Sequence, residues 1–186
     1  MSMAMCSSVS RAETMHYSAT KLGQNPFTVA RVIFLLVALI APATSQADNF
    51  LPFTGESFAT IKQQFTGSEF LLGLWSVDCP PCLVELDMMG ELLQKNPDLP
   101  FVLISTDPIE DRESALEFLE EFDLHERQSY MFADSFTERL RYSIDPNWFG
   151  ELPRSYFFDT QHTMQSHSGI MTIELLQQWF SRDLNL

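Results

Sequence analysis

Two cysteines, Cys79 and Cys82, are the residues of this chain best suited to chemistry. A disulfide between cysteines three positions apart closes a very small loop, so it would constrain little chain entropy. Thiol–disulfide exchange needs an accessible thiolate that attacks and a second sulfur that resolves the mixed disulfide. The spacing therefore predicts a redox pair, with Cys79 as the nucleophile and Cys82 as the resolving thiol.

The residues between and before the cysteines tune this chemistry. Pro80 and Pro81 predict a helix that begins here, because proline is favourable in the first helical turn. A sulfur at the N-cap faces the positive end of the helix dipole, which favours the thiolate of Cys79. The two prolines lack N–H groups, so the sulfur keeps only the Cys82 N–H as a donor. The charge of Asp78 also opposes the thiolate. Weak thiolate stabilisation favours a reductase over a strong oxidant.

Two other interpretations of the cysteine pair stay open, a structural disulfide and half of a zinc site. A zinc site needs two further ligands, and His125, His162 and His167 show no tight ligand spacing. We therefore expect no metal and no cofactor.

Hydrophobic periodicity predicts helices that alternate with strands over residues 57–182. Helices are expected over 57–65, 79–94, 109–122, 135–142 and 172–182. Strands are expected over 69–77, 100–106, 128–133, 155–159 and 163–168. Asp134 or Ser135 is the expected cap of the fourth helix. The alternation predicts an α/β sheet with parallel pairs and a closing antiparallel hairpin. The cysteines then follow a buried strand, where open α/β sheets place their sites.

Residues 1–47 have the composition of a secretory signal peptide. A basic flank precedes an apolar run of ten residues at 32–41, and the small residues Ser45 and Ala47 precede the expected cleavage point. The basic region is unusually long, and Met15 offers an alternative start. An uncleaved anchor is the other interpretation, although ten apolar residues are half of the roughly 20 needed to span a bilayer.

Residues 48–186 are expected to form one domain. The chain is 45% hydrophobic and 12% aromatic, which is enough for a packed core. Residues 48–186 contain 8 basic and 24 acidic side chains, a net charge of −16. This balance makes nucleic acid an improbable partner, because phosphate contacts need clustered Lys and Arg. Such charge is most often a solvated surface, and it also favours basic partners.

The order of these features resembles a known family. Residues 70–85 look like the strand and active-site helix of thioredoxin-fold proteins. Glu85, three residues after the second cysteine, is similar to the C-x-x-C-x-x-E pattern of the TlpA/ResA/CcmG branch. Residues 102–107 and 152–159 match the second strand and the cis-proline strand of that branch, and the likeness covers about residues 50–182. The resemblance implies a thioredoxin-like α/β fold, a central mixed sheet flanked by helices, preceded by a signal peptide.

The resemblance implies a periplasmic thiol–disulfide oxidoreductase. Most members reduce disulfides of client proteins such as apocytochromes c or copper-site assembly factors, and a membrane thiol reductase of the DsbD type supplies the electrons. Pro153 would be the cis-proline beside the cysteines. Glu85 would be a buried acid that tunes the thiols, or else an exposed helix residue. The implied client-binding residues are Leu152, which would offer backbone hydrogen bonds, Trp75, Pro80 and Pro81.

The sequence departs from the best-known members at four positions. Gly73 stands where thioredoxin has a buried Asp, and Asp78 replaces the common Trp before the first cysteine. Asp87 replaces a helix-kinking Pro, and Arg154 replaces the usual Thr after the cis-proline. The resemblance therefore does not identify the client protein. The alternatives are a DsbA-like oxidase, which would need a helical insertion longer than the stretch 107–153 allows, and a non-catalytic binding module or metallochaperone.

Overall fold

The computed structural model describes residues 50–180 and residue 184 of the chain. The predicted signal peptide, residues 1–47, lies outside the described residues, as does the predicted last turn of the C-terminal helix. No helix within the described residues is long and apolar enough to cross a membrane.

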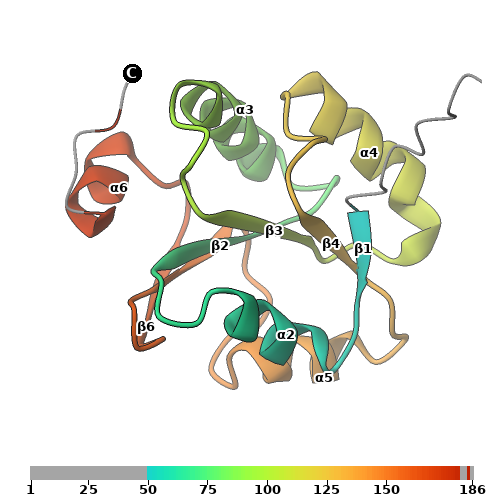
Figure 1. The fold of residues 1–186 in the computed structure, drawn as a ribbon. Helices are drawn as coiled ribbons and strands as arrows, with labels where there is room; N and C mark the ends of the chain where they lie inside the picture. The colour runs from blue at the N-terminus through green and yellow to red at the C-terminus, as the bar shows by residue number, and fades with distance from the viewer. Residues whose placement is uncertain (1–49, 181–183, 185–186) are drawn as a thin grey trace, which may run out of the picture. The chain divides into compact units, whose positions relative to one another are not determined.

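Strands and helices alternate through the described region (Figure 1). In chain order the elements are β1 (Phe50–Phe53), α2 (Ser57–Gln64), β2 (Phe70–Trp75), α3 (Pro80–Lys95), β3 (Phe101–Ser105), η1 (Ile109–Asp111), α4 (Arg112–Glu121), β4 (Ser129–Phe132), α5 (Thr137–Ile144), β5 (Arg154–Phe158), β6 (Met164–Ser168) and α6 (Ile173–Phe180). Apart from β1, each corresponds to an element predicted from the sequence, with shifts of one or two residues at most ends.

The strands form one mixed sheet in the order β1-β4-β3-β2-β5-β6. The pairs β1–β4, β4–β3 and β3–β2 are parallel, whereas β2–β5 and β5–β6 are antiparallel. The predicted α/β sheet with a closing antiparallel hairpin is therefore confirmed. The central strand β2 lies between a parallel and an antiparallel neighbour, and every residue in it is buried.

Alternating side chains of β2 build two hydrophobic cores, one on each face of the sheet. Leu71 and Trp75 point into the core beneath α3, α4 and α6. Phe70, Leu72 and Leu74 point into the core over α2 and α5. Figure 1 shows these two helical layers on opposite faces of the sheet. The period of two along an extended chain produces this division.

Two local features differ from the sequence prediction. Strand β1 was not expected, because it is short and contains Pro52, which lacks the N–H of a ladder donor. The strand is tolerated because it lies at the edge of the sheet beside β4. The expected capping of α5 is wrong: its N-cap is Phe136 and no side chain caps the helix. The Asp134 carboxylate accepts the Phe136 N–H instead, at 2.9 Å, one position before the helix.

Candidate active site

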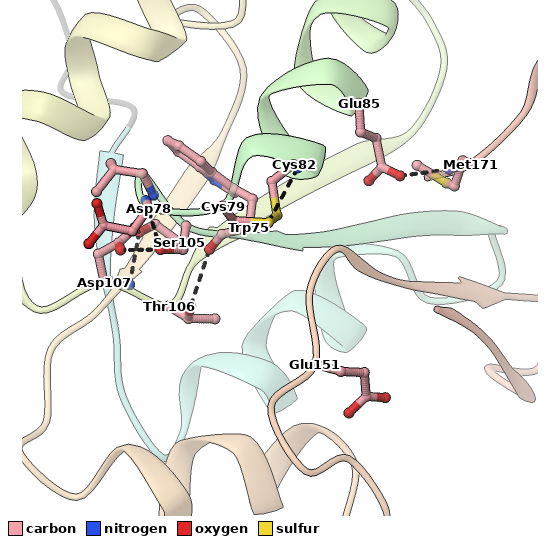
Figure 2. The surroundings of a disulfide bond; sticks show 12 residues. Trp75, Asp78, Cys79, Cys82, Glu85, Ser105, Thr106, Asp107, Glu151 and Met171 are labelled. Atoms are coloured by element: carbon pink, nitrogen blue, oxygen red, sulfur yellow. Dashed lines mark hydrogen bonds between the residues drawn. A yellow bond between two sulfur atoms is a disulfide. The ribbon is translucent and has the colours of Figure 1, made fainter. Parts of the chain in front are cut away.

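The two cysteines lie at the junction of β2 and α3, and their sulfurs are bonded at 2.03 Å (Figure 2). Cys79 is the N-cap of α3, as predicted, and its sulfur accepts the Cys82 N–H at 3.3 Å. Cys79 is half-buried, whereas Cys82 is only 1% exposed. One sulfur is thus within reach of an incoming molecule and the other is shielded by the helix.

The side chains around the disulfide differ strongly in exposure. Pro80 and Pro81 are exposed in the first turn of α3. Asp78 is exposed too, and its carboxylate has no hydrogen-bond or ion-pair partner among the described residues. Trp75 is 2% exposed and packs in the same core as Cys82, so its side chain offers almost no surface to a client.

The loop that leads into Cys79 is held by a carboxylate that lies two residues after the neighbouring strand β3. Asp107 accepts the Ser76 hydroxyl at 2.6 Å and the Val77 N–H at 3.0 Å. The Ser105 hydroxyl donates to the same carboxylate at 2.6 Å. The sequence alone predicts no role for Asp107. The available signal was topological, because β2 and β3 are adjacent parallel strands and their carboxyl ends meet at one edge of the sheet.

Glu85 is buried, at 5% exposure, one turn after Cys82 on α3. Its carboxylate accepts the Met171 N–H at 2.7 Å. Burial raises the pKa of Glu85 to about 7, and the Met171 N–H and the Ser155 hydroxyl oppose this rise. The alternative of an exposed helix residue is therefore wrong, because the β6–α6 connection folds over this side chain. A carboxyl with such a pKa exchanges protons readily near neutral pH.

Gly73 on β2 leaves room for an aromatic ring. A Cβ at this position would lie 3.1 Å from two ring carbons of Phe101 and 3.4 Å from Leu103. The ring thus occupies the space that a side chain at position 73 would fill. Ser155 of β5 is the registered partner of Gly73 in the sheet. The buried carboxyl of this site therefore comes from α3, as Glu85, and not from β2.

The Leu152–Pro153 peptide bond is cis. Leu74 of β2 pairs with Arg154 of β5 in the antiparallel ladder. From this pair the chain continues toward Cys79 on one strand and back to Pro153 on the other, so the two segments lie at the same end of the sheet. Pro153 is buried and its carbonyl accepts the Gly169 N–H at 3.0 Å. Leu152 is half-buried and contacts both cores.

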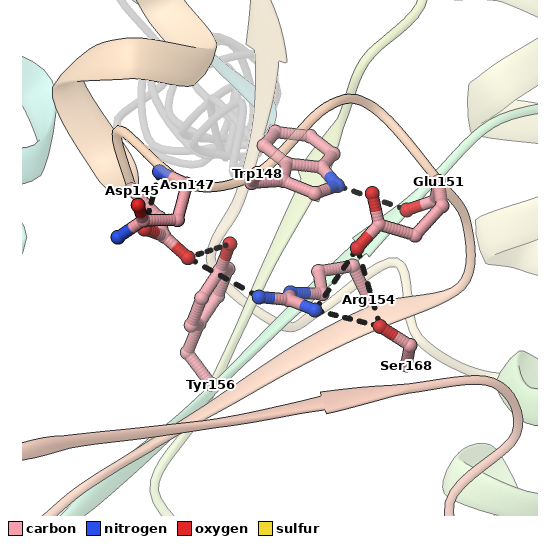
Figure 3. Close-up of polar contacts among 7 residues, drawn as sticks. All are labelled: Asp145, Asn147, Trp148, Glu151, Arg154, Tyr156 and Ser168. Atoms are coloured by element: carbon pink, nitrogen blue, oxygen red, sulfur yellow. Dashed lines mark hydrogen bonds and ion pairs between the residues drawn. The ribbon is translucent and has the colours of Figure 1, made fainter.

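Arg154 joins the segment before Pro153 to the β5–β6 hairpin (Figure 3). Its guanidinium donates to Asp145 at 3.2 Å, to Glu151 at 3.0 Å and to the Ser168 hydroxyl at 2.6 Å. The side chains of Arg154 and Asp145 are 11% and 5% exposed, which makes this a largely buried ion pair. The Tyr156 hydroxyl donates to the same Asp145 oxygen at 3.1 Å. The sequence marked Arg154 only as a departure from the family pattern.

Hydrogen bonds keep Asp145 ionised in this network. Burial raises the pKa of its carboxyl, but the Asn147 N–H, the Tyr156 hydroxyl and the Arg154 guanidinium together lower that pKa below its ordinary range. The ion pair is therefore present across the neutral range.

Taken together, the site contains a half-buried sulfur, a buried partner sulfur and a buried carboxyl on one helix. These are the groups that thiol–disulfide exchange uses. The structure brings Cys79, Cys82 and Glu85 onto α3, and it places Pro153 at the same end of the sheet. Within the described part of the chain, no three His, Cys, Asp or Glu side chains are grouped so as to hold a metal ion.

Solved structures of three thiol–disulfide oxidoreductases have a fold similar to that of this chain. A secreted disulfide oxidoreductase of Mycobacterium tuberculosis homologous to E. coli DsbE is 20% identical, with a TM-score of 0.52 over 64% of this chain and 84% of that chain. A thiol:disulfide interchange protein of the thioredoxin family from Chlorobium tepidum is 15% identical, with a TM-score of 0.52; the match covers 64% of this chain and 82% of that chain. The thioredoxin domain of a thiol-disulfide oxidoreductase from Bacteroides vulgatus is 15% identical, with a TM-score of 0.50; the match covers 66% of this chain and 84% of that chain. No family model and no curated protein matches the sequence. At these identities the likeness shows the thioredoxin fold.

Proposed function

We propose that this protein is an exported thiol–disulfide oxidoreductase that reduces the disulfides of client proteins. The observation that carries the proposal is the asymmetry of the pair: Cys79 is half-buried at a helix N-cap, whereas its bonded partner Cys82 is 1% exposed. A structural disulfide has no need of an accessible sulfur at a helix N-terminus, but an attacking thiolate does.

The reaction begins with the reduced pair. The Cys79 thiolate attacks one sulfur of a client disulfide, and the other client sulfur leaves as a thiolate. Cys82 then loses its proton and attacks the Cys79 sulfur in the mixed disulfide, which releases the second client thiolate. The client gains two electrons, and the Cys79–Cys82 disulfide is formed. A thiol donor must return two electrons before the next turnover.

Glu85 is proposed as the buried carboxyl group that assists Cys82 as a general base. The two side chains are three positions apart on α3, which places them on the same helical face. Since its pKa is about 7, Glu85 is present in both protonation states near neutral pH. It can therefore accept the proton of the Cys82 thiol when the mixed disulfide is resolved.

The reductive direction is supported by the donors around the attacking sulfur. Pro80 and Pro81 occupy the first two helical positions and have no N–H, so at this helix cap the Cys79 sulfur accepts the Cys82 N–H. The exposed charge of Asp78 disfavours a second negative charge on the adjacent residue. A weakly stabilised thiolate makes the reduced form a better electron donor.

The compartment, client and donor belong to the same proposal. The composition of residues 1–47 supports export, and one structural neighbour is described as secreted. We propose a periplasmic location, client proteins of cytochrome c or copper-site maturation type, and a membrane thiol reductase of the DsbD type as donor. Leu152 would bind the client backbone, with Pro80, Pro81 and Pro153 beside it.

The reduction potential tests the direction. The chain is equilibrated in dithiothreitol redox buffers and its free thiols are trapped, with Cys79→Ser as the control that cannot form the pair. We expect a potential near or below that of thioredoxin, about −270 mV. A potential near the −120 mV of strong oxidants would reverse the direction and make the protein an oxidase. If Cys79 and Cys82 do not interconvert between the dithiol and the disulfide, the protein is instead a binding module without redox activity.

A further inference from the structure

The segment around Leu152 is fixed on both sides by hydrogen bonds. Before it, the Glu151 carbonyl accepts the Trp148 indole N–H at 2.9 Å. After it, the Pro153 carbonyl accepts the Gly169 N–H at 3.0 Å. Among the described residues, neither the N–H nor the carbonyl of Leu152 has a hydrogen-bond partner. The Leu152 backbone is therefore held in place with both polar groups unpaired, and an extended peptide can bind such groups as one strand binds another.

The Arg154 side chain also fastens this segment (Figure 3). Its guanidinium donates to the Glu151 carboxylate at 3.0 Å, to the Ser168 hydroxyl at 2.6 Å and to the Asp145 carboxylate at 3.2 Å. The Ser168 hydroxyl donates to the same Glu151 oxygen at 3.2 Å. Asp145 and Glu151 lie at the two ends of the loop before Leu152. One guanidinium therefore holds that loop at two points and joins it to strand β6.

The burial of this network favours a role in geometry over a role in stability. The Arg154 and Asp145 side chains are 11% and 5% exposed. A buried ion pair adds little net stability compared with hydrophobic side chains of the same volume, because both charges lose their water. Within the described residues, the Arg154 Nε–H has no acceptor, which adds to the cost of burial. A planar guanidinium with several partners does, however, fix the positions of those partners relative to one another.

The fixed segment lies at the redox end of the sheet. Leu74 of β2 pairs with Arg154 of β5. From this pair, the chain leads on from β2 to Cys79, the N-cap of α3, and back from β5 to Leu152. A client strand that pairs with Leu152 therefore meets the same end of the sheet as the half-buried Cys79 sulfur. Because the segment is held in place beforehand, less conformational entropy is lost when the client binds.

We propose that Arg154 is a positioning residue that holds the Leu152 backbone ready to pair with an extended client peptide beside Cys79. It acts through Glu151 and Ser168, and not on the reacting sulfurs. The protein then prefers disulfides carried on extended peptide segments over small-molecule disulfides. This inference rests on the proposed reductase function and specifies how the same site binds its substrate.

Two disulfides with the same leaving thiol test this inference. One is a neutral peptide whose single cysteine is bonded to mercaptoethanol, and the other is hydroxyethyl disulfide, which has no peptide backbone. Single-turnover rates of the reduced protein at rising substrate concentration give the half-saturating concentration and the limiting rate.

Arg154→Lys keeps the charge but not the planar fork of the guanidinium. We expect it to raise the half-saturating peptide concentration about tenfold, the size of about one or two backbone hydrogen bonds to the client. The limiting rate with the peptide and the rate with hydroxyethyl disulfide should stay within about twofold of wild type, because only substrate binding is weakened.

Glu151→Ala tests the same contact without disturbing the buried ion pair. The Glu151 side chain is 47% exposed and Arg154 keeps Asp145, so this variant is expected to fold and decides the question even where Arg154→Lys does not fold. It should also raise the half-saturating peptide concentration about tenfold. Glu151→Gln keeps an oxygen that can accept from Arg154 and should stay within about threefold of wild type. Arg139→Lys is the matched control and should change no rate, because Arg139 pairs with Asp134 outside this network.

The possible failures are distinguishable. The positioning role is overturned if Arg154→Lys and Glu151→Ala bind the peptide as tightly as wild type does. It is also overturned if they lose the same factor with both disulfides, which indicates a general structural defect, or if Glu151→Gln is as impaired as Glu151→Ala, which assigns the effect to the charge of Glu151. A wild-type protein that reduces neither disulfide would instead overturn the reductase function itself.

Discussion

The backbone N–H of Met171 donates a 2.7 Å hydrogen bond to the carboxylate of Glu85 (Figure 2). This bond joins residues 86 positions apart and ties the β6–α6 connection to the helix that carries both cysteines. The C-terminal part of the fold therefore buries the acid of the redox site, and the state of that acid affects the stability of the whole domain.

Glu85→Gln is expected to change how stability depends on pH. The pKa of Glu85 rises from 4.5 to about 7 on folding, mainly through burial. Its stabilising contribution is full below pH 4.5, is lost as the pH rises toward 7, and is constant above that. A rise of this size corresponds to about 3 kcal/mol. Glutamine does not titrate and keeps an oxygen for the Met171 N–H.

Urea unfolding of the oxidised protein between pH 4 and 8 measures this effect. The unfolding free energy of wild type, taken relative to Glu85→Gln, should fall by about 3 kcal/mol over that range. A difference that stays constant with pH would mean that Glu85 titrates as an ordinary exposed carboxyl.

Asp107→Asn is expected to loosen the loop before Cys79. Ser76 and Val77 donate to different oxygens of Asp107, and an amide retains only one of these oxygens, so its NH2 group meets one of the two donors. A buried donor without its acceptor costs about 1–3 kcal/mol, so the unfolding free energy should fall by that amount. The Val77 amide should also exchange its hydrogen faster. Asp98→Asn, at an exposed position, is the control and should leave both quantities unchanged.

The elements that hold the cysteines could be predicted because their signals are local. Strand β2 is a continuous apolar run, and α3 follows it with two prolines in the first turn. The N-cap position of Cys79 follows from these features alone. The edge strand β1 gave no such signal, because it is four residues long, contains Pro52 and is defined by its pairing with β4.

The supporting contacts of the site could not be predicted because they join distant segments. Asp107 contacts Ser76 and Val77 across about 30 positions, and only the strand order brings them together. The burial of Glu85 depends on Met171, which lies beyond the hairpin. Spacing along one helix shows which side chains share a face, but not which of them a later segment will cover.

Arg154→Met is expected to destabilise the protein by leaving the Asp145 carboxylate buried without its cation. Breaking a buried ion pair on one side costs about 3–5 kcal/mol. Asp145 retains the Tyr156 hydroxyl and the Asn147 N–H, so the loss should lie at the lower end of this range. A double-mutant cycle with Asp145→Asn, measured by urea unfolding, isolates the pair. If the loss in the double variant equals the sum of the two single losses, the two side chains are not coupled.

Gly90→Ala is expected to destabilise the protein, although alanine is the better helix former. A Cβ at position 90 would lie 2.0 Å from the carbonyl oxygen of Phe122, at the end of α4. This neighbour is backbone and is held by the bond from the Phe122 N–H to Phe118, so α3 and α4 must move apart. The gain in helix propensity, about 1 kcal/mol, is smaller than the combined cost of the clash and the lost packing.

The expected net loss for Gly90→Ala is about 2 kcal/mol in urea unfolding. Gly55→Ala is the matched control, because nothing lies within 4 Å of a Cβ there. That variant should stay within about 0.5 kcal/mol of wild type. A Gly90→Ala protein as stable as wild type would show that α3, the helix that carries Cys79 and Cys82, is free to shift away from α4. The close approach of these two helices would then not determine where the redox pair lies.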